Sequence, residues 1–238
     1  MRVEKEDLSA VQVGTVGVNP VTAWWLLRGF RALRGGEWVV LNGANGGVGR
    51  GVLQLGRRWG VRCLAVVRGR GGEEGERLRG ELEALGAERV VGEEEVAERG
   101  CGEKVKEWTG GEGIRLGLNC VGGEAGMAMA KVLSPGGVMV TYGGMSGKPM
   151  RVGAGMLIFK DLKFEGFWVS RWSERHPEEK RRTVDALLEM MRRGEFRDGP
   201  VVEVPWGWGT ERRNLVDAVQ GTLEGYRKGK GVFVFGDM

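Results

Sequence analysis

The chain has 238 residues and a formal net charge of +4, with 36 basic and 32 acidic residues. The two signs are interspersed along the sequence, which argues against the one-sided basic stripe of a nucleic-acid-binding protein. A hydrophobic fraction of 41% is sufficient for one large or two small domains. No apolar run approaches the roughly 18 residues that a membrane-spanning helix needs, so we predict no membrane span.

The first 36 residues predict a polar leading segment followed by a helix. The pair Asn19-Pro20 is a helix-start signal, because proline fits the first turn of a helix. The apolar segment Thr22–Leu33 follows, and Gly35-Gly36 ends it. The N-terminal residues carry both charges without a long apolar core, so they do not resemble a signal peptide.

Next comes a predicted strand, glycine turn, helix and second strand. Trp38–Leu41 is an apolar run typical of a strand buried on both faces. Asn42–Gly49 contains four glycines, and helical periodicity runs from about Val48 to Gly60. Cys63–Val67 is the second apolar run. A glycine turn that opens a helix presents unpaired N–H groups and the positive end of the helix dipole, which favour a phosphate group.

The glycines by themselves are weak evidence, because Gly47, Gly49 and Gly51 do not match the spacing G-x-G-x-x-G. In a chain with 45 glycines, such a cluster also fits a simple loop. The order of strand, turn, helix and strand is what predicts a dinucleotide-binding fold.

The end of the second predicted strand indicates which dinucleotide binds. An NAD site usually has Asp or Glu about 20 residues after the glycines, to bind the ribose 2′-hydroxyl. This chain has Arg68 and Arg70 there, and its first following carboxylate is Glu73. Guanidinium groups match phosphate geometry, so we predict NADPH rather than NADH. The alternative is two solvated arginines in an arginine-rich chain.

The remaining elements complete an open α/β sheet. The patterns predict helices over Glu76–Leu85, Glu93–Glu98 and Met127–Leu133, and strands over Gly86–Val91, Leu116–Val121 and Val138–Tyr142. Ligands of such sheets lie outside the carboxyl ends of the strands. We therefore expect Asn45, Arg68, Asn119 and Tyr142 to line one crevice.

The last third of the chain predicts an edge strand and further helices. Leu162–Trp168 alternates like a strand at a sheet edge, which makes it a candidate for pairing across a twofold axis. Thr183–Arg193 has an amphipathic helical pattern, and we expect it to pack on the sheet rather than bind a partner. A helix over Leu215–Leu223 and a strand over Gly231–Phe235 follow.

The titratable side chains give no indication of a metal site. Cys63, Cys101 and Cys120 are odd in number and far apart, which fits neither a disulfide framework nor a zinc site. The single histidine, His176, precedes Pro177 in a charged turn. We therefore predict no metal ligand and no Ser-His-Asp triad.

Several motifs in order resemble one family. They are the turn Asn42–Gly49 with Gln54-Leu55, then VVRGR, LNCVGG, VTYGGMSGKP, LIFKDLKFEGFW and a terminal strand with a lysine. From about Leu8 to its C-terminus, the chain is similar to mitochondrial 2-enoyl thioester reductases. These are zinc-free members of the medium-chain dehydrogenase/reductase superfamily that reduce trans-2-enoyl-CoA or acyl-carrier-protein substrates in mitochondrial fatty acid synthesis.

The resemblance implies NADPH-binding roles for particular residues. They are Asn19, the pyrophosphate turn Asn45, Gly46, Gly47 and Val48, the 2′-phosphate clamp Arg68 and Arg70, the nicotinamide-side turn Tyr142, Gly143, Gly144 and Met145, the closing segment Phe167, Trp168, Val169 and Ser170, and Lys230. It further implies mitochondrial localisation, and the Leu162–Trp168 edge then predicts a homodimer.

The resemblance also implies an α/β fold with a Rossmann-type doubly wound parallel sheet and a C-terminal remnant of a GroES-like catalytic domain. Residues 1–36 would be the junction to that domain, 37–170 the NADPH-binding domain, and 171–238 the return towards the catalytic domain. The family's catalytic tyrosine lies in the preceding GroES-like domain, which this chain is expected to lack. Neither Tyr142 nor Tyr226 matches it, so no catalytic residue is assigned.

Two other functions stay open. The chain could bind NADPH without catalysis, or it could be an NADPH quinone or alkenal reductase of the same superfamily. If the chain exists without the GroES-like domain, we expect exposed apolar surface near Trp24, Trp25 and Phe167-Trp168.

Overall fold

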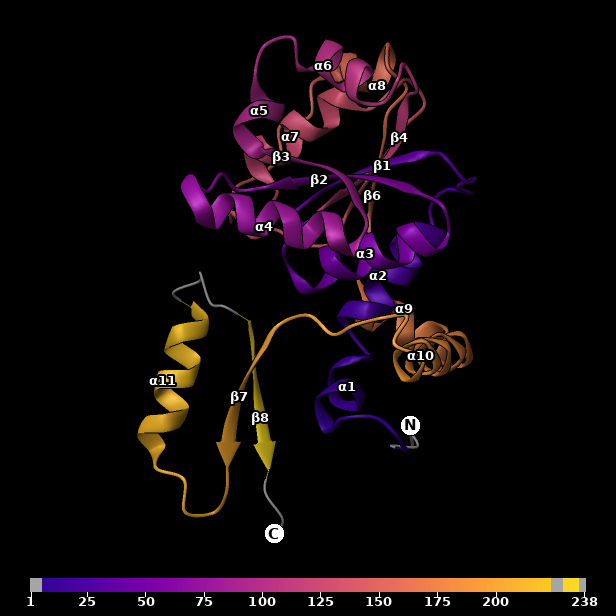
Figure 1. The fold of residues 1–238 in the computed structure, drawn as a ribbon. Coiled ribbons are helices and arrows are strands. Elements are labelled where there is room, and N and C mark those ends of the chain that lie inside the picture. The colour runs from indigo at the N-terminus through magenta and orange to yellow at the C-terminus, as the bar shows by residue number, and fades with distance from the viewer. Residues whose placement is uncertain (1–5, 224–228, 236–238) are drawn as a thin grey trace.

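A parallel six-stranded sheet forms the centre of the computed structural model, which describes residues 6–223 and 229–235 (Figure 1). Its order is β3-β2-β1-β4-β5-β6. The strands are β1 (Trp38–Asn42), β2 (Arg62–Val67), β3 (Ala87–Gly92), β4 (Ile114–Asn119), β5 (Val138–Thr141) and β6 (Lys163–Gly166). The chain adds β2 and β3 on one side of β1 and then crosses to add β4, β5 and β6 on the other side. The predicted doubly wound Rossmann-type sheet is therefore confirmed.

Helices cover both faces of this sheet. One face carries α2 (Asn19–Arg28), α3 (Gly47–Arg58) and α4 (Gly72–Leu85); the other carries α5 (Glu93–Ala97), α6 (Cys101–Trp108) and α7 (Gly123–Val132). Val39 and Leu41 of β1 belong to the first core and Trp38 and Val40 to the second. This alternation explains why β1 is apolar at every one of these positions.

The helix expected over Thr22–Leu33 begins and ends earlier, as α2 (Asn19–Arg28). Pro20 lies in its first turn, as the start signal predicts. The helix ends at Arg28, and Gly29 caps it, with its amide donating to the Trp25 carbonyl oxygen at 2.7 Å. Phe30 and Leu33 continue the hydrophobic pattern beyond the end of the helix. For this reason the predicted C-terminal boundary lies too far along the chain.

The sequence patterns missed several short elements. Helices α1 (Ala10–Thr15), α6, α8 (Ala154–Ile158) and α9 (Val169–Arg175) have eight residues or fewer, which is too short for a clear helical period. Strand β7 (Val201–Trp206) was missed as well. It contains Pro205, a residue that argues against a strand interior.

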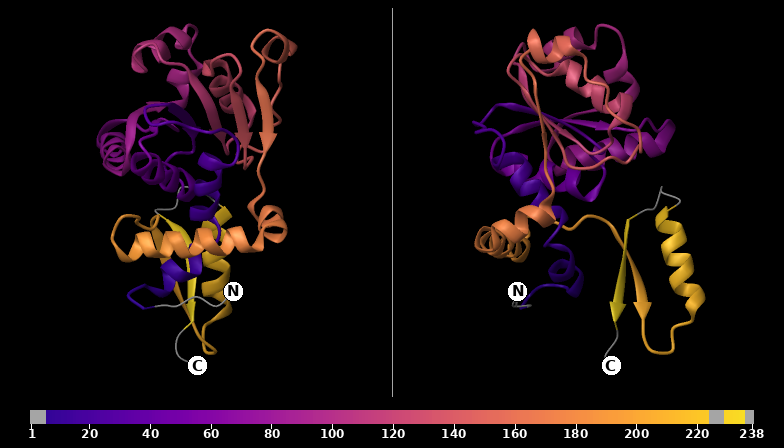
Figure 2. Two further views of the ribbon diagram at one scale, coloured as in Figure 1. Left: turned by 90° about the vertical axis from the view of Figure 1, so that its right-hand side faces the viewer. Right: turned by 180° about the vertical axis from the view of Figure 1, so that it is seen from behind.

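The C-terminal part forms a second layer beneath the sheet. Helix α10 (Pro177–Arg192) packs against α2, where the Trp25 indole Nε1 donates to Thr183 Oγ1 at 3.1 Å. Strands β7 and β8 (Lys230–Phe235) form a separate two-stranded parallel sheet, joined by α11 (Arg212–Leu223). Figure 2 shows this β7–α11–β8 unit below the six-stranded sheet from two further sides.

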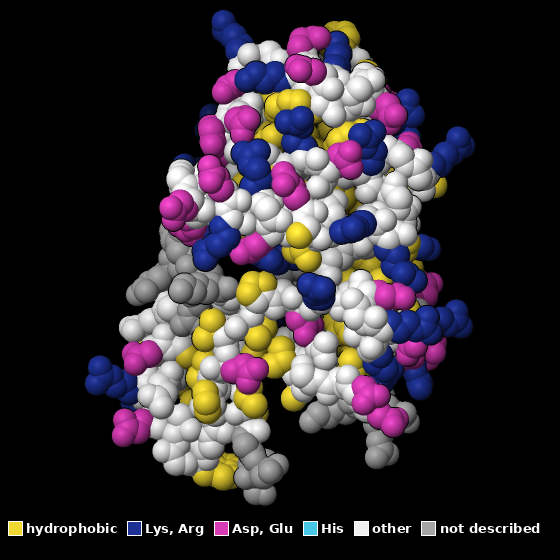
Figure 3. Space-filling model, in the orientation of Figure 1, with side chains coloured by type: hydrophobic (Ala, Val, Ile, Leu, Met, Phe, Trp, Pro, Cys, Tyr) yellow, Lys and Arg dark blue, Asp and Glu magenta, His cyan; other side chains and the backbone are white. Residues whose placement is uncertain are grey.

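Exposed apolar side chains gather in two regions. One is the β7–α11–β8 unit, where Trp208 is 91% and Phe235 is 65% exposed, and hydrophobic side chains show on the near face in Figure 3. The other is α8 and its end, where Ile158 and Phe159 are exposed. No helix among the described residues is both long enough and apolar enough to cross a bilayer.

The expectation of exposed tryptophans is wrong for Trp24 and Trp25. Both are partly buried: the Trp24 ring lies 4.9 Å from Trp59, and the Trp25 ring 4.5 Å from Trp172. Packing with α3 and α9 thus covers them within this chain. Trp168, by contrast, is 67% exposed.

Replacing Gly49 by alanine tests how closely α3 approaches the turn that follows β1. A Cβ at Gly49 would lie 2.5 Å from the Ala44 carbonyl oxygen and 2.6 Å from its Cα. We expect Gly49→Ala to lower the free energy of unfolding by about 1–3 kcal/mol, because backbone atoms must move apart. Urea unfolding monitored by circular dichroism measures the change.

Gly80→Ala is the matched control. Gly80 lies within α4, and a Cβ there would meet no atom within 4 Å. Alanine should therefore stabilise the protein by about 0.5–1 kcal/mol. Equal destabilisation by both substitutions would contradict the close approach at Gly49.

Candidate functional site

A cavity of about 590 Å³ lies beyond the carboxyl ends of β1 and β2, where the β7–α11–β8 unit approaches the sheet layer. Residues from five parts of the chain line it: α1–α2, the turn after β1, the segment from the end of β2 into α4, the segment before β7, and the start of β8. The predicted cofactor-binding residues among them are Asn19, Asn45, Gly46, Gly47, Arg70 and Lys230.

The turn between β1 and α3 is built for close backbone contacts. Gly43 has φ +58°, and a Cβ on it would lie 2.4 Å from Cys120 Sγ. A Cβ on Gly47 would lie 2.4 Å from Asn19 Nδ2. Glycine is therefore favoured at Gly43 by its positive φ, and at Gly47 a larger residue would displace the Asn19 side chain, which lies directly against the turn.

The N-terminus of α3 faces this cavity through Gly46 and Gly47. Its N-cap is Gly46, which provides no side-chain hydrogen bond to the first amides. The first N–H groups of a helix carry a partial positive charge, and here no side chain caps them. Because cationic side chains line the same cavity, this arrangement fits a phosphate group.

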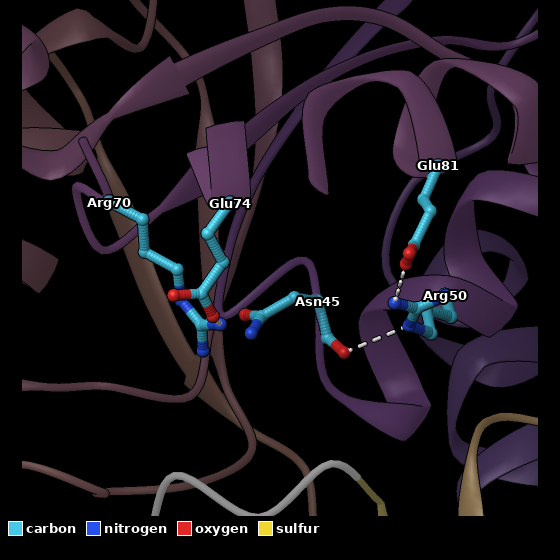
Figure 4. A network of polar contacts seen from close by, with 5 residues as sticks. All are labelled: Asn45, Arg50, Arg70, Glu74 and Glu81. Atoms are coloured by element: carbon cyan, nitrogen blue, oxygen red, sulfur yellow. Dashed lines mark hydrogen bonds and ion pairs between the residues drawn. The ribbon is translucent and has the colours of Figure 1, made fainter. Parts of the chain in front are cut away.

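Arg50 holds the glycine turn in place from within α3. Its Nε donates to the Asn45 carbonyl oxygen at 3.0 Å, and its Nη2 pairs with Glu81 Oε2 of α4 at 2.9 Å (Figure 4). The Arg50 side chain is only 15% exposed. No sequence pattern singles out Arg50, because only the fold shows that a residue five positions after Asn45 turns back to its carbonyl.

Arg70 also has an acidic neighbour in the cavity wall. It forms an ion pair with Glu74, one helical turn later, and the Asn45 side chain points towards this pair in Figure 4. Arg68, its predicted partner in the phosphate clamp, is exposed and does not line the cavity. The structure thus brings Arg70, but not Arg68, to the glycine turn.

Asn119 anchors the turn after β4. Its Oδ1 accepts from Asn42 Nδ2 at 2.8 Å and from the Gly122 amide at 3.0 Å. Asn42 Oδ1 in turn accepts from the Cys120 amide at 2.8 Å. Both asparagines are buried, so the expectation that Asn119 lines a crevice with Asn45 is wrong. Its side chain is used to fix two neighbouring strand ends.

The predicted nicotinamide-side residues lie outside the cavity, around the carboxyl ends of β4 and β5. Tyr142 is partly buried beside Cys120, and the Met145 amide donates to the Cys120 carbonyl oxygen at 2.9 Å. Gly143 approaches the same carbonyl, with a notional Cβ 3.1 Å away. Met145 itself is 73% exposed, and Gly144 has open space around it.

The segment after β6 begins on this side as well. Phe167 meets Phe30 edge to face at a centroid distance of 5.6 Å, and the next residues, Val169 and Ser170, open α9 after the exposed Trp168. Val48 is partly buried in the core beside the glycine turn rather than in the cavity wall. Tyr226 lies outside the described residues.

The pKa of Tyr142 is raised well above its usual value. Burial is the main cause, and the charge and hydrogen bonding of the adjacent Cys120 add to it. Burial also raises the pKa of the Cys120 thiol. At neutral pH both groups are therefore protonated and uncharged.

Residues 47–189 match the family model described as zinc-binding dehydrogenase. The chain belongs to the zinc-binding dehydrogenase family. Within residues 6–223 and 229–235, however, no group of three or more His, Cys, Asp or Glu side chains could hold a metal ion. The three cysteines are free and buried. The described part of this family member does not fit a zinc site, and no chemical step proposed here uses one.

Among named relatives, the chain resembles mitochondrial enoyl-[acyl-carrier-protein] reductases, as its motifs predict. It is 41% identical to that of Yarrowia lipolytica over 84% of the chain and 52% of the relative. The human protein of the same name is 38% identical, again over 84% of the chain and 52% of the relative. The chain thus spans about half the length of the curated relatives it matches.

Solved structures agree with this similarity. The structure of an Etr1p complex with NADP and crotonyl-CoA superposes with a TM-score of 0.85 at 31% identity, over 92% of this chain and 60% of that one. A mutant enoyl thioester reductase from Candida tropicalis gives 0.87 at 30% identity, over 95% and 62%. A Bacillus thuringiensis protein described as a candidate NADPH:quinone reductase, at 22% identity and a TM-score of 0.80 over 98% and 66%, shares the fold.

Titration of the tyrosines tests the environment of Tyr142. Its folded-state pKa lies above the usual value of 10, so the folded protein keeps a proton that the unfolded chain releases as the pH rises past 10. Stability should therefore fall above pH 10 by about 1 kcal/mol per pH unit from this group. Tyr142→Phe should remove that share of the decline, measured by urea unfolding at several pH values.

The tyrosinate absorbance of the folded protein provides the control. Because the pKa of Tyr142 is raised well above 10, its hydroxyl should not ionise near pH 10 in the folded protein. Tyr142→Phe should therefore leave the native absorbance change near pH 10 unaltered. A native titration step near pH 10 that disappears in Tyr142→Phe would contradict the buried, neutral hydroxyl.

Proposed function

We propose that this chain binds NADPH and belongs to an enzyme that reduces trans-2-enoyl thioesters to saturated acyl thioesters. The observation that carries the proposal is the cavity, which joins an uncapped glycine-turn helix to Asn19, Arg70 and Lys230. The similarity to enoyl reductases, one of them solved with NADP and crotonyl-CoA, supports the same ligand pair.

The wall of the cavity suits the anionic part of a dinucleotide. The turn Asn45–Val48 would place the pyrophosphate at the N-terminus of α3, where backbone amides and the helix dipole favour negative charge. Arg70 would bind the 2′-phosphate, with Arg68 approaching from outside the cavity. Asn19, beside Gly47, and Lys230, at the start of β8, also line the cavity and would add hydrogen bonds to the same cofactor.

The nicotinamide half would lie along the second group of residues. Tyr142–Met145 follow β5, and Phe167–Ser170 follow β6, so both segments continue from carboxyl strand ends. The buried Asn42–Asn119 pair would fix the turn beneath the ring. The exposed Trp168 and Met145 would shield the ring and the acyl chain from water once both are bound.

Bound NADPH would supply a hydride to Cβ of the enoyl thioester. Negative charge then develops on the thioester oxygen and needs a hydrogen-bond donor, and Cα needs a proton. Tyr142 is protonated at neutral pH, but it does not match the family's catalytic tyrosine, which lies in the GroES-like domain, so no catalytic residue is assigned to this chain. Its residues bind and orient the cofactor.

The proposed domains separate cofactor binding from proton donation. Residues 37–170 would be the NADPH-binding unit, residues 1–36 a junction to a GroES-like domain, and residues 171–238 a remnant of that catalytic domain. The relatives are named as mitochondrial proteins, so we propose mitochondrial fatty acid synthesis as the setting.

Two alternatives use the same cofactor site. A binding module would hold NADPH without turnover. A quinone or alkenal reductase would reduce a different acceptor, and the fold it shares with the NADPH:quinone reductase does not decide between acceptors.

A homodimer through the edge of the six-stranded sheet is part of the proposal. β6 is the outermost strand on its side, and next to it Leu157, Ile158 and Phe159 are 50%, 69% and 85% exposed. An unpaired edge beside an exposed apolar segment is a common setting for subunit contact. An Etr1p/Etr2p heterodimer from Candida tropicalis is among the similar solved structures.

Cofactor titration with an enoyl substrate tests the function. We expect NADPH to bind at least about tenfold more tightly than NADH, because only NADPH offers a phosphate to Arg70. Isothermal titration calorimetry measures both affinities. NADPH oxidation with crotonyl-CoA then measures turnover, with a quinone and an alkenal as comparison acceptors.

The outcomes separate the candidates. Turnover of crotonyl-CoA above the rates with the quinone and the alkenal supports the enoyl reductase. Tight NADPH binding with no turnover by folded protein favours the binding module. Equal affinity for NADH and NADPH would rule out the 2′-phosphate site that all three functions share.

Substitution of Phe159 tests the subunit contact. We expect the wild type to sediment as a dimer at micromolar concentration and Phe159→Glu to sediment as a monomer, because a charge at the interface would have to be desolvated. Trp208→Glu is the control: Trp208 is equally exposed but lies in the β7–α11–β8 unit. A dimer unaffected by Phe159→Glu, or lost equally in Trp208→Glu, would rule out this edge.

A further inference from the structure

One face of α4 carries alternating charges into the cavity. Glu74, Arg77 and Glu81 all line it, together with the apolar Leu78. Their spacing of three and four residues places them along one side of the helix. Elsewhere on α4, Leu82 is buried in the core, and Arg79 is exposed and does not line the cavity.

The two acidic residues already have cationic partners, whereas Arg77 has none within the described chain. Glu74 pairs with Arg70, and Glu81 pairs with Arg50. Among residues 6–223 and 229–235, Arg77 makes neither an ion pair nor a side-chain hydrogen bond. A guanidinium in a cavity wall, between two engaged carboxylates, leaves its donors available for a ligand.

The charges lining the whole cavity favour an anion. Its basic residues are Arg50, Arg70, Arg77, Arg197 and Lys230, and its acidic residues are Glu74, Glu81 and Asp198. Two positive charges are left over. Arg50 is occupied by the turn itself, so Arg70 and Arg77 are the cations that α4 and the segment before it offer to a ligand.

We propose that Arg77 is a second binding residue for the 2′-phosphate of NADPH, and that Glu74 is the counter-ion which that phosphate displaces from Arg70. The inference rests on the proposed NADPH site and goes beyond it, because it assigns the second guanidinium to α4 rather than to Arg68. In the free protein Glu74 neutralises Arg70; in the complex the phosphate bridges Arg70 and Arg77.

This exchange gives a physical basis for choosing between the two dinucleotides. A 2′-phosphate dianion competes with a single carboxylate for the Arg70 guanidinium and also reaches Arg77. A 2′-hydroxyl carries no charge and leaves the Arg70–Glu74 pair intact. Glu74 therefore lowers the affinity for NADPH, and Arg77 restores it, while neither bears on an unphosphorylated ribose.

The test uses the adenosine end of the cofactor alone, in the full chain. Titration calorimetry compares 2′,5′-ADP with 5′-AMP in the wild type, Arg77→Gln and Arg79→Gln. We expect Arg77→Gln to weaken 2′,5′-ADP by about tenfold or more, as for loss of one hydrogen bond between charged groups, and to leave 5′-AMP within about twofold. Arg79→Gln removes the same charge from the same helix and should change neither.

Glu74→Gln gives a result of the opposite sign. Without its carboxylate Arg70 is free before binding, so 2′,5′-ADP should bind about threefold to tenfold more tightly and 5′-AMP as before. A purely structural role of Arg77 or Glu74 would move both nucleotides together. Far-ultraviolet circular dichroism verifies that each variant is folded.

The possible failures are distinguishable. If the wild type prefers 2′,5′-ADP but Arg77→Gln behaves like Arg79→Gln, the role of Arg77 is overturned and the NADPH site stands. If Glu74→Gln weakens 2′,5′-ADP, the counter-ion exchange is overturned. If the wild type binds 2′,5′-ADP no better than 5′-AMP, both the inference and the proposed NADPH site are overturned.

Discussion

Close backbone approach around the glycine turn is the constraint on which the rest of the structure depends. Gly49 lets α3 start directly against Ala44, and Gly51 lets the same helix approach Ala23 of α2, where a Cβ would lie 2.9 Å away. Because α2 in turn packs against α10, the absence of side chains at Gly49 and Gly51 sets how closely α3, α2 and α10 pack on one another. The position of the uncapped N-terminus of α3, and so of the cavity, follows from that spacing.

The Rossmann-type parallel sheet was predictable because its strands follow local patterns. Apolar runs such as Trp38–Leu41 are long enough to identify, and right-handed crossovers leave few ways to connect them. The ends of short helices were not predictable, since α2 ends at Arg28 while its apolar pattern continues to Leu33. For the site, the order of strand, turn and helix together with the family resemblance selected Asn45, Gly46, Gly47 and Arg70, all of which line the cavity.

What sequence spacing could not give was the direction of side chains. Arg68 and Arg70 look alike in a sequence, and residues two apart in a strand would share one side. Both lie in the irregular segment between β2 and α4, however, and only Arg70 lines the cavity. Asn119 looked like a ligand-facing residue, whereas its amide is used to hold Asn42 and the turn after β4. Arg50, Glu74 and Glu81 belong to the site through helix packing, which no local motif encodes.

The small parallel sheet has a consequence for cofactor binding. β7 and β8 pair only with each other in the described chain, so each has one edge with no sheet partner, and much of their side-chain surface is exposed. Such a unit opens at a lower free-energy cost than the central sheet, and its amides should exchange with solvent sooner. Val201 and Lys230 of this unit form part of the cavity wall. A ligand bound in the cavity would therefore stabilise this unit against local unfolding and slow the hydrogen exchange of β7 and β8. The exchange of the buried strands around β1 would change little.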